Sequence, residues 1–488
     1  MGCWPIPGIA ITHEGERYKL DCYGETFYAN GYIADLDTYV ILGFYDGISK
    51  DEIIEDEVKL KPYYNVWDKL NFTLQLSNKS IRFIKNRIDC ENFRRQLEIR
   101  SNSRGLECPS IDIMIPGEAG LTPIFSALHK FGIFAENLGI PPQELHERLS
   151  KKILGIEKDF IYAVSAFYAH LYKKFEEDKI VTFNQLFHQI GNSPSKLKDV
   201  DFQTLFSMKN LMIDEFQDIS PSIVKVVLAL HQELKKRTDG KQQPTLICVG
   251  DDWQSIYGWR GSSPHFFLQF NKFFSGAKPE PLTMNENFRS SQTIINAAER
   301  FIHPIKQRSN KHGEAKHPEV KDLAHPLFCV TKYSEADVRN VTLALLNMAG
   351  QDESVYILSR TGEGYKAFND ISDKRLTTTT IHQSKGLEAE YVILIGDCLS
   401  FGKNTLKNAL YEEANFPSTY DKMQKDEALR LAYVGVTRAK KICIWFGEPK
   451  SSGVLNQAPH DGITRHDLSS KELLRHIKDK ASAKIPTA

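Results

Sequence analysis

The chain has 488 residues, which is enough for about three domains of ordinary size. Hydrophobic residues make up 41% of it and charged residues 25%, a composition typical of globular proteins in water. The 62 basic and 62 acidic side chains cancel, which excludes a uniformly basic coat for nucleic acid, so any such contact must be local.

The cysteines indicate a redox compartment. All 8 lie far apart, and no two of them form a C-x-x-C pair. This spacing disfavours a zinc ribbon or a small disulfide-bonded domain and indicates a reducing environment. No run of about 18 apolar residues occurs, and the start of the chain does not resemble a signal peptide. We therefore expect a cytoplasmic protein that does not enter a membrane.

The apolar pattern changes along the chain. In residues 1–115, short alternating runs such as TYVILGFYDG predict a strand-rich N-terminal region of unassigned type. In residues 116–208, apolar residues recur every three or four positions, which predicts a helical segment. From residue 209 onward, apolar runs alternate with helical stretches, which is typical of an α/β fold with a parallel sheet. The tail, residues 449–488, is polar, and we expect it to be loosely attached apart from a short helix in SSKELLRHIKDK.

A strand followed by two carboxylates is the clearest chemical signal. In LMIDEFQDIS, Asp214 and Glu215 come directly after an apolar run. Such a run places them at the carboxyl edge of a parallel sheet, where these folds bind phosphates. Asp214 would hold Mg²⁺, and Glu215 would orient or deprotonate an attacking water. The alternative is a strand that ends in two solvated acids, and the FQD that follows makes this alternative the weaker one.

A second apolar run, in ICVGDDWQSIYGWRGS, ends before Gln254, a neutral side chain suited to sensing a γ-phosphate. Tyr257, Trp259 and Arg260 follow at once. Aromatic rings on a loop beside a nucleotide sensor can stack on unpaired bases. The alternative is that both rings belong to the core, but the glycines between and after them favour an exposed loop.

These two segments resemble motifs II and III of the UvrD/Rep-type helicases of superfamily 1A, and three further motifs follow in the family's order. LTMNENFRSSQTI is similar to motif IV, where the resemblance makes Arg289 the first arginine finger and puts Phe288 against the adenine. LRLAYVGVTRAKK resembles motif VI, with Arg438 as the second finger, supported by Tyr433 and Thr437.

TTTTIHQSKGLEAEYVILIG resembles motif V. The resemblance implies that Thr380 and His382 face the DNA backbone and that Gly386 and Glu388 lie near the nucleotide. FEEDKIVTFNQLFHQIG resembles the segment that precedes motif II in this family. The interval between motifs IV and V is too short for a large inserted subdomain. The segments DEFQDIS and VGDDWQ are most similar to the helicase IV branch.

The resemblance implies an α/β fold of RecA-like P-loop NTPase lobes. Residues 209–280 would form a partial first lobe and residues 281–448 a complete second lobe, with a helical segment similar to the 1B subdomain at 116–208. The activity implied is ATP- and Mg²⁺-dependent 3′→5′ movement on single-stranded DNA and the opening of duplex junctions. Gln254 would join the two arginine fingers at the γ-phosphate, and the Tyr257 loop would hold DNA.

The phosphate-binding loop of such a motor, G-x-x-x-x-G-K-S/T, does not occur in the sequence. Gly240-Lys241 and Gly402-Lys403 lack the following Ser or Thr, and the segment 117–120 (GEAG) lacks the lysine. We therefore expect this chain to be inactive as an ATPase on its own. It could be a truncated or split helicase whose loop lies on a separate polypeptide, or the product of a disrupted reading frame.

Two readings of another class stay open. The chain could be a degenerate helicase kept as a non-catalytic adaptor that binds DNA or a protein machine such as RNA polymerase. Asp46 with Glu57 and Lys59 superficially matches the metal site of a nuclease fold, although a charged surface segment explains the same residues better.

Overall fold

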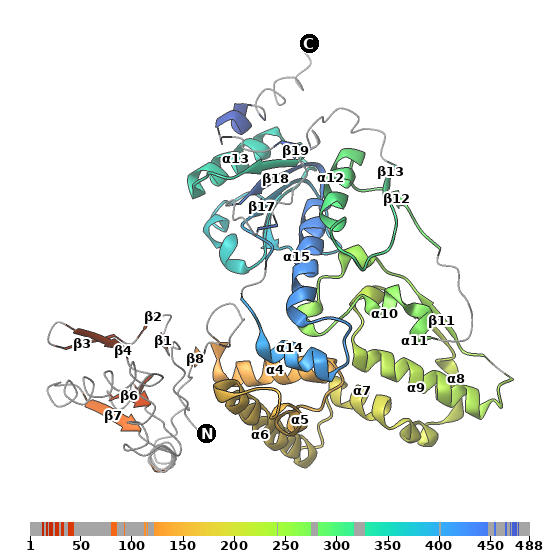
Figure 1. Cartoon of the computed structure of the whole chain (residues 1–488). Coiled ribbons are helices and arrows are strands. Elements are labelled where there is room, and N and C mark those ends of the chain that lie inside the picture. Colours follow the sequence, from red (N-terminus) through yellow and green to blue (C-terminus); the bar gives the residue numbers. More distant parts are fainter. Residues whose placement is uncertain are drawn as a thin grey trace. The chain divides into compact units, whose positions relative to one another are not determined.

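The architecture is given by a computed structural model (Figure 1). The structure describes residues 122–447, except for 242, 275–281, 317–326 and 400–401, together with short stretches between 12 and 115 and between 453 and 477. The GEAG segment and the Asp46, Glu57 and Lys59 positions lie outside the described residues. Among the described helices, none has the length and apolar character needed to cross a membrane.

The chain divides into two compact units. Unit 1 consists of Met1–Ala135, Ile140–Val181 and Phe401–Glu413, and unit 2 of Glu136–Gly139, Thr182–Ser400 and Ala414–Ala488. The strands of unit 1 are β1 (Thr12–His13), β2 (Glu16–Arg17), β3 (Lys19–Cys22), β4 (Glu25–Tyr28), β5 (Gly31–Ile33), β6 (Thr38–Leu42), β7 (Ser80–Ile84), β8 (Asp112–Ile113) and β9 (Thr122–Pro123). Its helices are α4 (Ile124–Asn137, whose last residues fall in unit 2), η2 (Pro142–Glu144), α5 (Leu145–Leu149), α6 (Gly155–Glu177) and α14 (Thr405–Glu413).

The helices of unit 1 pack through apolar stripes of helical period. In α6, the buried residues Ile161, Val164 and Tyr168 recur every three or four positions, as the sequence pattern predicts. The Tyr168 hydroxyl donates a hydrogen bond of 2.8 Å to a main-chain carbonyl of α4. Helix α14 joins this bundle from far along the chain, because the Tyr411 ring stacks on Phe134 with ring centroids 6.1 Å apart. The sequence pattern does not predict this placement.

The strands of unit 2 are β10 (Asn210–Ile213), β11 (Thr245–Cys248), β12 (Glu286–Asn287), β13 (Glu314–Ala315), β14 (Leu327–Val330), β15 (Val355–Ser359), β16 (Leu376–Thr380), β17 (Ala389–Ile395), β18 (Ala439–Phe446) and β19 (Thr464–Arg465). Its α-helices are α7 (Phe183–Asn192), α8 (Phe202–Ser207), α9 (Pro221–Arg237), α10 (His265–Leu268), α11 (Phe270–Phe273), α12 (Gln292–Ile302), α13 (Glu335–Met348) and α15 (Tyr420–Val436). Its 3₁₀ turns are η3 (Pro194–Asp199), η4 (Phe216–Asp218), η5 (Asp252–Gln254), η6 (Gly258–Arg260), η8 (Gly362–Gly364) and η9 (Lys366–Phe368).

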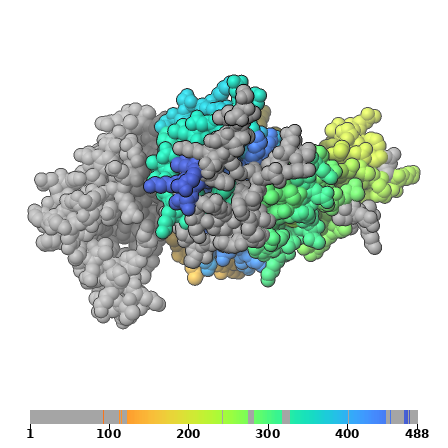
Figure 2. All heavy atoms as spheres, turned by 90° about the horizontal axis from the view of Figure 1, so that it is seen from above, coloured from red at the N-terminus to blue at the C-terminus, as the bar shows by residue number. Residues whose placement is uncertain are grey.

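Six strands of unit 2 form one sheet in the order β16-β15-β17-β18-β14-β19, and every pairing in it is parallel. Neighbouring residues of β17 point to opposite faces, so Val392 and Leu394 pack with α12 and α15, whereas Tyr391 and Ile393 pack with α13. The polar side of α13 forms part of the outer surface in the view from above (Figure 2). The sheet is thus covered on both faces, as parallel sheets require. This confirms the predicted α/β fold class.

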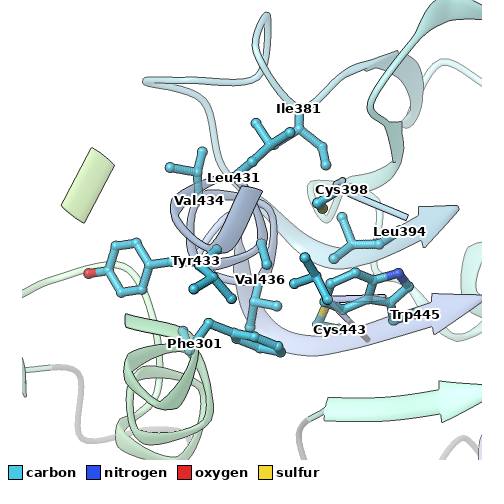
Figure 3. Packing of buried hydrophobic residues seen from close by; sticks show 14 of the residues in the cluster. Phe301, Ile381, Leu394, Cys398, Leu431, Tyr433, Val434, Val436, Cys443 and Trp445 are labelled. Carbon is cyan, nitrogen blue, oxygen red and sulfur yellow. The ribbon is translucent and has the colours of Figure 1, made fainter. Parts of the chain in front are cut away.

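The core on the α15 face is built around large rings. Phe301 of α12 lies against Trp445 of β18, with ring centroids 5.6 Å apart, and Tyr433 and Val436 of α15 close the same cluster (Figure 3). The Trp445 indole N–H donates to the Gly396 carbonyl at 2.7 Å, so its polar atom is satisfied.

Part of the polar tail belongs to the sheet. Strand β19 pairs with β14, which places Thr464 beside Leu327. Leu473 and Ile477 are buried in the cluster that lies under α13. Both residues lie in the segment SSKELLRHIKDK, which the sequence predicts as a short helix, and they attach this segment to the core.

Strands β10 and β11 form a separate parallel pair. The face of this pair that includes Ile213 and Cys248 packs on the cluster around Phe216, Val224 and Phe266. The opposite face is open within the described part of the chain, where Met212 is 78% exposed and Ile247 52%. The apolar run LMIDE predicts a strand buried on both faces, and the difference arises because no described element covers this second face.

We expect Phe301→Ala to destabilise unit 2 by about 3–5 kcal/mol, because it removes a fully buried ring from the main core. Leu343→Ala, on the exposed side of α13, is the control and should cost less than about 1 kcal/mol. Urea titration followed by tryptophan fluorescence measures both. Equal midpoints for the two variants would contradict the assignment of this core.

Candidate functional site

The pairing of β10 with β11 brings the two predicted carboxylate segments together. Ile213 lies opposite Cys248 in parallel register. The ladder continues past the strands, since the Val249 amide donates to Ile213 and the Phe216 amide donates to Val249, both at 2.9 Å. Asp214–Glu215 and Asp251 therefore leave the sheet at the same carboxyl edge, which confirms that these strands are neighbours in one parallel sheet.

Glu215 adopts a left-handed backbone conformation, with φ 50° and ψ 38°. This conformation is uncommon for a residue other than glycine and carries a local cost in free energy. It turns the chain so that Phe216 enters the core while the Glu215 side chain stays exposed. The carboxylate of Asp214, also exposed, accepts the Glu215 amide at 2.8 Å. Two acids are thus presented to solvent on a stiff turn.

Gln217 connects the two strand ends and is fully buried. Its amide nitrogen donates to the Glu215 carboxylate, and its amide oxygen accepts the Asp251 backbone N–H at 2.9 Å. The Gln217 carbonyl accepts the Ser255 hydroxyl at 3.1 Å. Sequence reasoning used FQD only to reject chance, so this role of Gln217 was missed.

The Asp251–Gln254 turn is closed by its own side chains. Asp251 accepts the Trp253 amide at 2.9 Å and the Gln254 side-chain amide at 2.8 Å. Lys311 binds the Asp251 carboxylate and lies 3.5 Å from that of the buried Asp252. No motif in the sequence marks Lys311, which is far from this turn along the chain.

Arg438 directly precedes β18 of the six-stranded sheet and contacts Gln254. Its guanidinium donates to the Gln254 amide oxygen at 3.3 Å and to the Val434 and Leu387 carbonyls at 3.0 and 3.1 Å. These are all neutral acceptors, and burial followed by the nearby Arg289 lowers the pKa of Arg438 to about 10. The side chain therefore remains a buried cation at neutral pH, and a site of this kind favours an anion.

Arg289 and Glu388 form an ion pair of 3.0 Å, and Lys440 lies 2.8 Å from the same carboxylate. The hydrogen bond from Lys440 lowers the pKa of Glu388, and burial raises it. Because the effect of the lysine is larger, the pKa lies below its ordinary value. Phe288, next to Arg289 in the chain, is 67% exposed. Gly386 has φ 85°, a conformation that favours glycine.

Lys385 binds two of the three acids that follow β10, Glu215 and Asp218. Its ammonium group lies 2.9 Å from Glu215 and also contacts Asp218. Burial raises the pKa of Asp218 to about 6 even though Lys385 opposes that change. Burial lowers the pKa of Lys385, but the nearby carboxylates of Asp218 and Glu215 have a larger effect. The pKa of Lys385 is therefore raised. Sequence reasoning quoted this lysine within motif V without assigning it, and its position beside Gly386 was the available signal.

The predicted DNA-binding side chains also converge. The ring centroids of Tyr257 and Trp259 lie 6.1 and 6.0 Å from that of His382, and the Arg260 guanidinium lies 4.5 Å from the Trp259 ring centroid. Trp259 is exposed, whereas Tyr257 is partly buried and donates from its hydroxyl to the His382 carbonyl at 3.2 Å. Thr380 ends β16, and its hydroxyl accepts the Gln383 amide at 3.2 Å.

His382 is an uncharged member of this cluster. Burial, then Arg360 and Arg260, lower the pKa of His382 to about 4. Its Nε2 atom is buried and has no hydrogen-bond partner among the described residues. A neutral imidazole with one unused nitrogen is suited to hydrogen bonding or ring contact rather than to neutralising a phosphate.

The lowered pKa of His382 predicts a pH dependence of stability. In the unfolded chain His382 takes up a proton near pH 6.5, but in the folded chain only near pH 4. The unfolded state therefore binds more protons in this window, so the free energy of unfolding should fall by up to about 3 kcal/mol as the pH drops from 6.5 to 4. His382→Gln should lack this component in urea titrations. Parallel pH profiles of the two proteins would contradict it.

Comparisons with known proteins agree with this geometry. The family model of the UvrD/REP helicase N-terminal domain matches residues 52–275, and that of the UvrD-like helicase C-terminal domain matches residues 363–445. The first match begins well upstream of β10, in the stretch that the sequence pattern left unassigned.

Among relatives, DNA helicase IV of Escherichia coli is 28% identical over 322 residues, 63% of this chain and 42% of that protein. ATP-dependent DNA helicase PcrA of Staphylococcus epidermidis is 26% identical over 216 residues, 44% of this chain and 25% of that protein. DNA helicase II of Rickettsia typhi is 37% identical over 101 residues, 21% of this chain and 14% of that protein. The chain thus matches less than half the length of each relative. With both family domains in the expected order, the chain belongs to the UvrD/Rep-type helicase family.

Proposed function

We propose that this chain carries the catalytic carboxylates, the γ-phosphate sensor and both arginine fingers of an ATP-driven motor that moves on single-stranded DNA. One observation carries the proposal. A continuous series of hydrogen bonds runs from Glu215 through Gln217 and Asp251 to Gln254 and on to Arg438. It joins the acids that follow β10 to the buried cation beside the six-stranded sheet, and this supports a site at which phosphoryl transfer is stabilised from both sides.

In this proposal Asp214 holds Mg²⁺ and Glu215 acts as the base. Within the described residues no cluster of three or more acidic, histidine or cysteine side chains suits a metal ion. Mg²⁺ commonly binds through one or two carboxylates together with phosphates and water, so a single exposed Asp214 fits this ion when nucleotide is present. Lys385 now neutralises Glu215 and Asp218, and we propose that it releases Glu215 when the metal supplies positive charge.

The buried cation Arg438 and its neighbour Arg289 would meet the γ-phosphate together with Gln254. We propose that Phe288 lies against the adenine ring and that Glu388 and Gly386 border the nucleotide. The exposure of Phe288 and the ion pair that holds Arg289 beside Glu388 support this assignment. Binding of phosphate between Arg438 and Asp214 would draw the two sheets together, which is how such motors convert hydrolysis into movement.

We propose that Trp259 stacks on an unpaired base, with Arg260 and His382 behind it and Thr380 on the DNA backbone. The exposure of Trp259 and the guanidinium against its ring support stacking. Tyr257 would serve mainly to hold the loop, because its hydroxyl is bonded to the main chain of His382. The 3′→5′ direction, the opening of duplex junctions and a cytoplasmic location rest on the family resemblance and the cysteine pattern.

In this proposal the phosphate-binding loop comes from a partner. No G-x-x-x-x-G-K-S/T occurs in the 488 residues, and that loop supplies the backbone amides and lysine that hold the β- and γ-phosphates. We propose that a separate polypeptide supplies the loop. Among the described residues, none covers the apolar face of β10 and β11 that carries Met212 and Ile247, and this supports a further layer at this sheet. The absent loop equally favours the second candidate, a non-catalytic adaptor that binds DNA or a protein machine such as RNA polymerase.

The purified chain should hydrolyse ATP negligibly, even with single-stranded DNA, because positioning and charge stabilisation provide nearly all of the catalysis of phosphoryl transfer. A coupled assay for released phosphate measures this. DNA-stimulated hydrolysis by the isolated chain that disappears in Glu215→Gln would contradict the proposal, because it would reveal another phosphate site within this sequence.

Single-stranded DNA should bind weakly and in a salt-dependent manner without ATP, because stacking and phosphate contacts do not need the missing loop. Trp259→Ala should weaken binding by about 1–3 kcal/mol and Tyr257→Ala with Trp259→Ala by about 2–4 kcal/mol if both rings stack. Tyr257→Phe keeps the ring and removes only the hydroxyl bond to His382, so it separates stacking by Tyr257 from its role in holding the loop. Fluorescence anisotropy of a labelled oligo-dT strand measures the affinity. An unchanged affinity in folded Trp259→Ala would show that this ring has a structural role and does not stack on a base.

A further inference from the structure

The loop that carries Trp259 is held from several directions. The Ile256 amide donates to Asp218, and the His382 ring is hydrogen-bonded to the Ile256 main chain. The Tyr257 hydroxyl donates to the His382 carbonyl, and the Arg260 carbonyl accepts the Asn137 side-chain amide at 2.8 Å. These contacts fix the two ends of the loop. The middle of the loop, at Gly258, is fixed by a different element.

Glu427 of α15 makes that contact. Its carboxylate accepts the Gly258 backbone N–H and also the Gln424 side-chain amide at 3.0 Å. The approach is so close that a Cβ atom on Gly258 would lie 2.3 Å from the Glu427 Oε2 atom. A side chain at position 258 would therefore displace the Glu427 carboxylate from this contact. Tyr257 and Trp259 flank this point.

Glu427 is also a buried acid, only 7% exposed. Burial raises the pKa of Glu427 to about 7, against the opposing effects of Arg360, which follows β15, and Arg430, one turn along α15. Burying a carboxylate is costly unless cations and hydrogen-bond donors compensate for it. The compensation here comes from those two arginines, Gln424 and the main chain of the Trp259 loop. A side chain needed only to fill the core would not require such partners.

We propose that Glu427 is a positioning residue that holds the Trp259 loop against α15 in the geometry that stacks on a base. This inference rests on the proposed single-stranded DNA binding. Because α15 is continuous, its middle and the residue just beyond its C-terminus both contact the segment that follows β11: Glu427 contacts Gly258, and Arg438 contacts Gln254. Movement of α15 at the γ-phosphate would therefore carry the base-stacking loop with it.

The first experiment needs no DNA. Hydrogen exchange of the full chain, read by mass spectrometry, reports the opening of the segment 256–261. Glu427→Leu removes the acceptor and should speed exchange of this segment at least about tenfold, since a lost hydrogen bond of about 1.4 kcal/mol corresponds to that factor. Glu427→Gln keeps an acceptor oxygen and should restore protection. Glu233→Leu, which removes an equally buried acid from α9, is the matched control and should leave the segment unchanged.

The second experiment is a double-mutant cycle on the affinity for labelled oligo-dT. Glu427→Leu should weaken binding about as much as Trp259→Ala, and the double variant should bind no more weakly than Trp259→Ala alone, because both changes remove the same contact. If Glu427→Leu does not fold, Gly258→Ala perturbs the same contact from the loop side and should give the same pattern.

The outcomes separate the two claims. Unchanged exchange of 256–261 in folded Glu427→Leu, or strictly additive losses in the cycle, would overturn the role of Glu427. A wild-type chain that binds no oligo-dT would instead overturn the proposed DNA binding, and the exchange experiment would still decide whether Glu427 holds the loop.

Discussion

The buried amide of Gln217 is the interaction on which the rest of the site depends. It contacts the Glu215 carboxylate on one side and the Asp251 main chain on the other, and it has no access to solvent. A buried amide is stable only when its donors and its acceptor are satisfied, so the two strand ends are held in one arrangement. The strained turn at Glu215 persists because this arrangement over-determines it.

Two cations connect the ends of β10 and β11 to the six-stranded sheet. Lys385 bonds to Glu215 and Asp218, while Arg438 bonds to Gln254, so cations of the second sheet meet acids and amides of the first at two points. Arg438 is fully buried among neutral acceptors, which makes it available to an anion without first breaking an ion pair. The same helix that leads to Arg438 also holds Gly258 through Glu427, so the nucleotide side and the base-stacking side share one rigid element.

The sequence predicted what local pattern and spacing determine. The parallel pairing of β10 with β11 followed from two apolar runs that each end in acids. The assignment of Tyr257 and Trp259 to DNA came from the composition of their loop and that of His382 from the family resemblance, and the three rings lie together in the structure. Contacts between residues distant in sequence could not be predicted, because nothing local marks Lys311 as the partner of Asp251 or Glu427 as that of Gly258. The attachment of α14 to unit 1 was not predicted for the same reason, because Phe134, on which Tyr411 of α14 stacks, lies far away in the sequence.

The central claim is that Arg438 belongs to a half-site that becomes catalytic when a phosphate-binding loop is supplied. The most direct measurement is ATP hydrolysis, with single-stranded DNA, by the chain mixed with a recombinant polypeptide that carries a strand, a G-x-x-x-x-G-K-S/T loop and the following helix. The account predicts restored turnover that falls by about 10³-fold or more in Arg438→Ala. It also predicts no such loss in Arg339→Ala, which removes a surface partner of Asp370. Equal turnover of the two variants, or no turnover with any such polypeptide, would contradict it.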